Sequence, residues 1–328
     1  MTGALPSVSV VIPTFRRPAL LARCLAAVLA QRLRAEAFEV IVVDDGHDDA
    51  TRAAVEALAP SGGAPALVYL RPAGGRGPAV ARNAGWRAAR APLVAFTDDD
   101  TIPSRDWLLE GVAAMRDPAL AAACGGVCVP GASDPPTDHE LMTRGLESAE
   151  FVTANAFVRR DALERVGGFD ERFRRAWRED SDLQFRLQHE VGAVGRAPRA
   201  TVLHPVRRER WGVSLRQQRN AFFDALLYKK HPRLYRERIR RVPPWDYYAI
   251  VAATLAGPAL FALGRPVPGA AALALAGVLV LAFAARRLRR TSRAPAHVAE
   301  MLVTSALIPF LAVYWRLRGA WRFRTLFL

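Results

Sequence analysis

The chain has 328 residues, 51% of them hydrophobic, and a formal net charge of +15 at pH 7, which is enough apolar material for one large domain or a domain with an appendage. The charge is uneven, because residues 1–205 carry 24 basic and 26 acidic side chains whereas residues 206–328 carry 22 and 5. The three cysteines, Cys24, Cys124 and Cys128, exclude a disulfide framework and lack the second ligand pair of a zinc site.

Strands and helices alternate over the first hundred residues. Apolar, β-branched runs predict strands at 8–12, 38–43, 67–70 and 93–96. Alanine- and leucine-rich segments between them predict helices at 18–34, 51–58 and 79–90. Such alternation is typical of a mostly parallel α/β sheet with flanking helices. Downstream the pattern is looser, and we expect strands near 124–129, 153–159 and 201–203 and helices near 106–115 and 181–190.

Two acidic motifs end predicted strands. Asp44-Asp45-Gly46 follows the second strand, and Asp98-Asp99-Asp100 follows the fourth. Both therefore lie at the carboxyl edge of the predicted sheet, where open α/β sheets bind their ligands. Adjacent carboxylates repel one another, and a hard divalent cation such as Mg²⁺ or Mn²⁺ would neutralise them. For the first motif, turn formation is the structural alternative.

The composition changes at residue 206. Residues 206–241 hold twelve basic and three acidic side chains interleaved with aromatic ones, a pattern that by itself would suit nucleic acid. Two apolar segments follow, at about 247–263 and 267–285, and the second is a run of 19 uncharged residues. About 20 apolar residues span a bilayer. Dense positive charge on both sides of the pair predicts a transmembrane hairpin with cytoplasmic flanks, which argues against nucleic acid as a partner.

A third apolar run, 301–315, is shorter and is followed by Arg316, Arg318, Arg322 and Arg324. If it crossed the membrane, these arginines would lie outside the cytoplasm, against the usual charge distribution. At about 299–315 we expect an interfacial or third helix, and favour the interfacial or re-entrant form. The first residues lack the features of a signal peptide, so the N-terminal domain is expected in the cytoplasm. The predicted organisation is a domain at 1–205, a basic amphipathic juxtamembrane segment at 206–245 and a multi-pass membrane region at 246–328.

Five motifs in consistent order resemble those of the family 2 glycosyltransferases, which are inverting enzymes with the Rossmann-like GT-A fold. They are Val11-Ile12-Pro13-Thr14-Phe15-Arg16, Val42-Val43-Asp44-Asp45-Gly46, Ala81-Arg82-Asn83-Ala84-Gly85, Phe96-Thr97-Asp98-Asp99-Asp100, and Gly167-Gly168-Phe169-Asp170-Glu171 followed by Glu179-Asp180. His47 stands where the family more usually has serine. The resemblance covers residues 7 to about 205. It implies a GT-A fold and transfer of a sugar from a nucleotide-diphosphate sugar.

The resemblance also implies a donor site. Pro13, Thr14 and Phe15 would form the wall around the nucleotide base, and Asp45 would accept from a uracil-type N3–H, which favours a UDP-sugar. The other implied nucleotide-sugar contacts are Asp44, Arg82, Asn83, Asp98 and Asp99. For Arg82, a solvated position on its helix is an equal alternative. Asp98 and Asp100 are implied metal ligands together with His204, for which a structural role is an equal alternative. Which of the three aspartates touches the metal stays open at this point.

Inversion by single displacement needs a base that takes the proton from the acceptor hydroxyl. Asp180 resembles the family's base, with Trp177 and Glu179 expected on the acceptor side. Capping of the following helix is the alternative role for Asp180. Processive members carry a Gln-x-x-Arg-Trp segment, but here Arg207 replaces the glutamine before Arg210-Trp211. We therefore expect one sugar to be transferred per acceptor.

The predicted function is metal-dependent transfer of one sugar to a lipid-linked or membrane-associated acceptor by an enzyme of the cell membrane. Anionic lipids are the expected partners of the basic segment. A nucleotidyltransferase acting on a sugar phosphate is one alternative, although the loop after the first strand lacks the glycines of that class. A catalytically inactive membrane scaffold is the other alternative.

Overall fold

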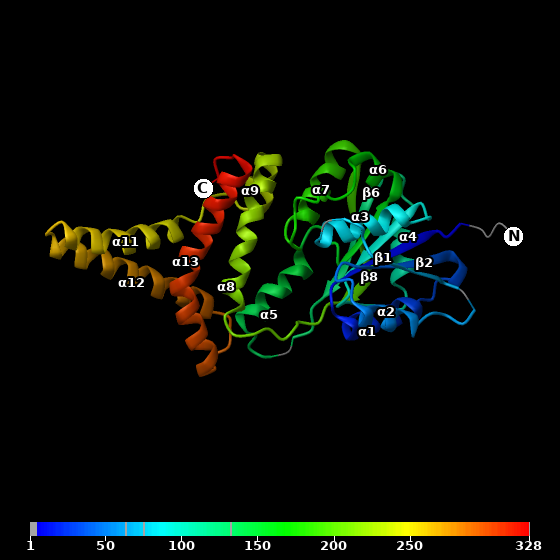
Figure 1. Cartoon of the computed structure of the whole chain (residues 1–328), viewed down its shortest axis with the longest axis horizontal. Coiled ribbons are helices and arrows are strands. Elements are labelled where there is room, and N and C mark those ends of the chain that lie inside the picture. Colours follow the sequence, from blue (N-terminus) through cyan, green and yellow to red (C-terminus); the bar gives the residue numbers. More distant parts are fainter. Residues whose placement is uncertain (1–4, 63, 75, 132, 328) are drawn as a thin grey trace. The chain divides into compact units, whose positions relative to one another are not determined.

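The computed structural model describes residues 5–62, 64–74, 76–131 and 133–327, which fall into two compact units (Figure 1). The first unit comprises Met1–Pro130 and Arg144–Pro205, and the second comprises Gly131–Thr143 and Val206–Leu328. Residues 131–143 were predicted within the first domain, yet they pack with the second unit. The first four residues of the predicted domain and the last residue of the predicted membrane region lie outside the described residues.

Eight strands form one mixed sheet in the order β3-β2-β1-β4-β7-β6-β8-β5. Four of the seven pairings are parallel. The parallel half consists of β3 (Ala66–Leu70), β2 (Phe38–Asp44), β1 (Val8–Thr14) and β4 (Leu93–Thr97). The other half consists of β7 (Asn155–Arg159), β6 (Leu120–Cys128), β8 (Ala193–Leu203) and the short β5 (Ile102–Pro103). Strand β7 is antiparallel to both of its neighbours, β4 and β6.

The central strands are covered on both faces. Every residue of β2 and β4 is buried, which explains why these strands are mostly apolar and show no alternation; in β2 only Glu39 and the terminal Asp44 are charged. The helices of this unit are α1 (Pro18–Leu29), η1 (Ala35–Ala37), α2 (Asp49–Glu56), α3 (Pro78–Ala88), α4 (Trp107–Ala114), η2 (Arg144–Ser148), α6 (Arg160–Val166) and α7 (Glu179–Glu190). Close packing requires glycine at Gly111 of α4, where a Cβ atom would lie 2.0 Å from the ring of Phe157.

The second unit is helical. Its elements are α5 (Asp138–Thr143), α8 (Val213–Gln217), η3 (Gln218–Asn220), α9 (Ala221–Lys230), α10 (Pro232–Leu234), η4 (Tyr235–Ile239), α11 (Trp245–Ala262), α12 (Pro266–Leu288) and α13 (Pro295–Phe323). The two helices predicted to pair, α11 and α12, lie side by side (Figure 1). At the end of the pair away from the connecting turn, Arg286 of α12 forms an ion pair with Asp246 of α11. The turn between them uses Gly264 in the left-handed region at φ +71°.

Two helices, α12 and α13, are long and apolar enough to cross a membrane by length and composition. The expectation of a short third helix at about 299–315 was wrong in length, because α13 runs from Pro295 to Phe323. The last eight residues of α13 include Arg316, Arg318 and Arg322 beside Leu317, Ala320 and Trp321, so the helix continues beyond the apolar run.

Candidate active site

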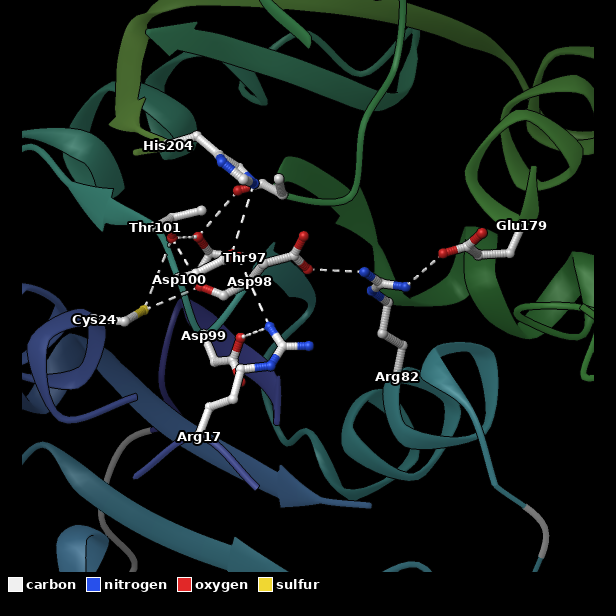
Figure 2. A network of polar contacts seen from close by, with 11 residues as sticks. Arg17, Cys24, Arg82, Thr97, Asp98, Asp99, Asp100, Thr101, Glu179 and His204 are labelled. Atoms are coloured by element: carbon white, nitrogen blue, oxygen red, sulfur yellow. Dashed lines mark hydrogen bonds and ion pairs between the residues drawn. The ribbon is translucent and has the colours of Figure 1, made fainter. Parts of the chain in front are cut away.

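The turn after β4 directs the three consecutive aspartates to different partners (Figure 2). Asp99 is 3% exposed and accepts hydrogen bonds from Thr14 Oγ1 at 2.7 Å and Arg17 Nη1 at 2.9 Å. Burial raises the pKa of Asp99 to about 6. Asp99 therefore joins the end of β4 to the end of β1, and both its oxygens are used within the domain. Its predicted contact with the nucleotide stays a prediction.

Asp98 and Asp100 come together with His204, which follows β8 (Figure 2). Each of the three side chains offers one ligand atom, and these atoms lie within 4.8 Å of one another. His204 Nε2 is 3.6 Å from Asp100 Oδ1, while the buried Nδ1 has no hydrogen-bond partner among the described residues. Two carboxylates and an imidazole suit Mg²⁺ or Mn²⁺, whose opposite ligands lie about 4.2 Å apart. The donor set and its spacing therefore fit a divalent metal.

Arg82 of α3 lies between this cluster and helix α7 (Figure 2). Its Nη2 donates to Asp98 Oδ1 at 2.8 Å, and its Nη1 donates to Glu179 Oε1 at 3.0 Å. Burial alone would lower the pKa of Arg82, but the two carboxylates outweigh it and raise that pKa. The two alternatives for Arg82 were a contact with the nucleotide sugar and a solvated position on its helix. The solvated alternative was wrong, because the Arg82 side chain is only 3% exposed.

Helix α7 begins at Glu179 and carries two acidic residues in succession. Asp180 Oδ1 accepts from the backbone N–H of Ser181 at 2.7 Å, and no hydrogen bond from the described residues reaches Asp180 Oδ2. Burial raises the pKa of Asp180. Burial and the neighbouring Asp180 raise the pKa of Glu179 to about 8. Asp180 is not the N-cap residue of this helix, because Arg178 holds that position; its carboxylate contacts the helix start through the N–H of Ser181.

The two aspartates after β2 have different surroundings. Asp44 accepts from the N–H groups of Gly46 and Asp48 and from the hydroxyl of Tyr69, so its carboxylate is fully engaged in the turn. Asp45 accepts from the N–H of Gly77 through Oδ2, whereas its buried Oδ1 has no hydrogen-bond partner among the described residues. Asp45 Oδ1 is therefore the oxygen of this motif whose hydrogen-bonding capacity is unused among the described residues.

The remaining predicted residues differ in how open they are. Phe15 is 42% exposed, and Pro13 and Trp177 are half-buried. The guanidinium carbon of Arg178 lies 4.5 Å from the ring centre of Trp177, as in a cation–π contact. The amide of Asn83 exchanges hydrogen bonds with Phe169, Glu171 and Trp86, so it ties α3 to the loop before α7. A nucleotide contact by Asn83 stays a prediction.

The sequence reasoning missed Arg17. This residue holds Asp99 and also lies 3.8 Å from Asp100, which makes it a counter-charge of the acidic turn. The available signal was the Arg16-Arg17 pair directly after the first strand, at the same sheet edge as the aspartates.

Two family profiles match the chain. The profile described as "Glycosyl transferase family 2" matches residues 9–168, and the one described as "Glycosyl transferase family group 2" matches residues 93–315, which is more than half of the chain. The chain belongs to the family 2 glycosyltransferases. The predicted family is thereby confirmed.

Two relatives and one solved structure illustrate the likeness. The validoxylamine A glucosyltransferase of Streptomyces hygroscopicus subsp. jinggangensis is 31% identical over 280 residues, covering 72% of this chain and 64% of the relative. The glycosyltransferase AglE of Haloferax volcanii is 30% identical over 178 residues, covering 52% of this chain and 58% of the relative. This chain thus spans less than two thirds of the length of either relative.

The solved structure is the mannosyltransferase PcManGT from Pyrobaculum calidifontis in complex with GDP-Man and Mn²⁺. It superposes with a TM-score of 0.55 at 23% identity, covering 97% of this chain and 85% of that chain. This likeness confirms the predicted GT-A fold.

Proposed function

We propose that this protein is a membrane-anchored, metal-dependent, inverting glycosyltransferase that moves one sugar from a nucleotide-diphosphate sugar to a lipid-linked or membrane-associated acceptor. One observation carries the proposal. The cluster of Asp98, Asp100 and His204 lies on one side of Arg82. On the other side, Arg82 binds Glu179, and the next residue is Asp180, whose Oδ2 accepts no hydrogen bond from the described residues. A donor side and an acceptor side therefore adjoin one another.

On the donor side, Asp98, Asp100 and His204 would hold Mg²⁺ or Mn²⁺. When bound, such an ion neutralises the negative charge that develops on a leaving diphosphate. Asp45 Oδ1 would accept an N–H from the base, such as N3–H of uracil, so a UDP-sugar is the favoured donor. Pro13 and the exposed Phe15 would provide the apolar wall beside the base. Thr14, Asp44, Asn83 and Asp99 would shape this site through the hydrogen bonds described above.

On the acceptor side, Asp180 Oδ2 would take the proton of the acceptor hydroxyl. The acceptor oxygen then forms its bond to C1 of the sugar while the bond from C1 to the diphosphate oxygen breaks. The electron pair of that bond leaves with the nucleoside diphosphate, and C1 is inverted. Trp177 and Glu179 would line the acceptor side.

The second unit would anchor the enzyme in the cell membrane as a multi-pass protein with a cytoplasmic catalytic domain. Support comes from α12, which is long and apolar enough to cross a membrane, from the apolar helix α11 that pairs with it, and from the positive charge on both sides of the pair. Each cation of the basic segment 206–245 near an anionic lipid surface adds about 1 kcal/mol of attraction.

The proposal is tested with the full chain in lipid nanodiscs and a panel of nucleotide sugars, with and without Mn²⁺. One donor is expected to release a nucleoside diphosphate, and EDTA is expected to stop the release. Adding a lipid extract should accelerate donor consumption and yield a glycosylated lipid. Release of pyrophosphate would instead identify a nucleotidyltransferase, and the absence of both nucleotide binding and turnover would identify an inactive scaffold.

A further inference from the structure

Helix α13 carries an exposed apolar stripe along most of its length. Val303, Leu307, Tyr314, Leu317 and Trp321 are exposed, and Trp321 is 81% exposed. Their spacing of three, four or seven residues puts them on one side of a helix. The opposite side packs within the second unit through Met301, Ile308, Ala312 and Gly319. The stripe is about 27 Å long at 1.5 Å per residue.

Arg287 fixes the level at which α12 meets α13. It lies just beyond the apolar run of α12, and its side chain is 10% exposed. It donates to Asp138 at 2.7 and 3.3 Å, to Thr304 Oγ1 at 2.7 Å and to Ser305 Oγ at 3.1 Å. If α12 crosses the bilayer, this polar cluster marks the boundary with water. Thr304 and Ser305 then lie at that boundary too.

Beyond Ser305, α13 follows α9 and runs across the base of the α11–α12 pair (Figure 1). Gly319 allows close approach, because a Cβ atom there would lie 2.5 Å from the carbonyl oxygen of Phe222. Phe222 also packs against Trp315 and Phe323, with ring centres 6.4 and 5.0 Å apart. Lys229 Nζ donates to the carbonyl oxygen of Phe323 at 2.7 Å. The second half of α13 is thus bound to a helix that ends in two lysines.

If α13 crossed the membrane, the elements packed against it, α8, η3 and α9, would therefore enter the bilayer as well. These elements contain Arg216, Arg219, Lys229 and Lys230. Arg219 lies beside Trp315, half-way between Ser305 and the end of α13, so it would be at mid-depth, where a charged side chain costs about 2.5–3.5 kcal/mol. A position in the interface avoids this cost, because the cations then lie among headgroups while the stripe contacts acyl chains.

We propose that α13 lies in the plane of the membrane interface, on the side of the bilayer where α12 ends. Its stripe of Val303, Leu307, Tyr314, Leu317 and Trp321 faces the acyl chains, and the exposed Arg318 and Arg322 bind anionic headgroups. The partner of this surface is an anionic lipid leaflet. The inference rests on the proposed membrane anchoring by α11 and α12.

The test is a measurement of depth in nanodiscs that contain anionic lipid. The background is the full chain with Cys128→Ser, since Cys128 is exposed while Cys24 and Cys124 are buried. Spin labels are placed singly through Val303→Cys, Tyr314→Cys and Trp321→Cys, with Val267→Cys and Val278→Cys on α12 as controls. Depth is read from the relative accessibility of each label to oxygen and to a water-soluble nickel chelate.

The three labels on α13 are expected to report one depth within roughly 5 Å, since an interfacial helix lies in the membrane plane. Labels at Val278 and Val267 should report the bilayer centre and the far interface. Depths on α13 that spread over about 27 Å would show a spanning helix and overturn this inference alone. Aqueous accessibility at Val278 would overturn the membrane anchoring itself, and this inference with it.

Discussion

Replacing Glu179 by glutamine measures the cost of a buried carboxylate in the candidate active site. Glu179 is 3% exposed, with Oε1 bound to Arg82 and Oε2 buried without a hydrogen-bond partner among the described residues. Its pKa is raised from 4.5 to about 8, mainly by burial and next by Asp180. The folded protein thus binds this proton more tightly than the unfolded chain. The carboxylate therefore opposes folding increasingly as pH rises from about 4.5 to about 8.

The size of the effect follows from the two pKa values. At 1.36 kcal/mol per pKa unit, the rise from 4.5 to about 8 corresponds to at most about 5 kcal/mol of lost stability above pH 8. Glutamine keeps an oxygen that can accept from Arg82 and carries no charge. Glu179→Gln should therefore match the parent near pH 5 and exceed its stability at pH 9. Since 1 kcal/mol shifts the Tm of a domain of this size by about 2–4 °C, the gain is at most roughly 10–20 °C.

The assay is thermal unfolding of the full chain in detergent and EDTA at pH 5, 7 and 9, followed by tryptophan fluorescence. Glu39→Gln is the matched control, because Glu39 is also buried and pairs with Arg90 at 2.7 Å. Burial would raise the pKa of Glu39, but hydrogen bonds from Ser9 and Arg90 outweigh it and lower that pKa. The control should therefore destabilise the protein at pH 7 and 9. A Tm difference for Glu179→Gln that is equal at pH 5 and pH 9, or negative at pH 9, would refute the reasoning.

Three further predictions concern the base, the metal and the core. Asp180→Asn should lower transfer by about 10²- to 10⁴-fold while the nucleotide Kd from calorimetry changes less than twofold, and near-parental turnover would remove Asp180 as the base. Asp100→Asn and His204→Ala should each weaken Mn²⁺ binding by at least about tenfold in a paramagnetic-resonance titration. The control is Asp106→Asn, which removes a carboxylate from a surface ion pair with Arg32 and should leave Mn²⁺ binding unchanged. Gly111→Ala should lower the free energy of unfolding by roughly 1–3 kcal/mol, because its methyl group would overlap the Phe157 ring. Gly277→Ala meets open space and should leave stability unchanged or slightly raised. Equal Tm values for the two variants would contradict this packing argument.

The parallel half of the sheet could be predicted from the sequence because each of its strands is an apolar run ended by polar or turn-forming residues. The rest depends on contacts between distant residues. Strand β8 begins at Ala193, eight residues before the predicted strand, since Gly195 and Pro198 interrupt its pattern. The assignment of residues 131–143 to the second unit involves the ion pair of Asp138 with Arg287, which lie 149 positions apart.

The candidate site shows the same division. The family resemblance implied Asp98, Asp100 and His204 as metal ligands, with a structural role equally open for His204, and the structure brings the three side chains together. The orientation of Asp99 toward Thr14 and Arg17 could not be read from the sequence, because it depends on the turn after β4. Likewise, the bridge made by Arg82 requires burial against Glu179, which is 97 positions away.

The central claim is that Asp180 drives a metal-dependent single displacement at C1 of a nucleotide sugar. An early-time proton NMR course of the full chain in nanodiscs, with Mn²⁺ and the donor identified by the panel, tests it most directly. An α-linked donor should give the β-configured product together with free nucleoside diphosphate, and Asp180→Asn should give neither at a comparable rate. A product that retains the α configuration, or release of pyrophosphate, would contradict the account.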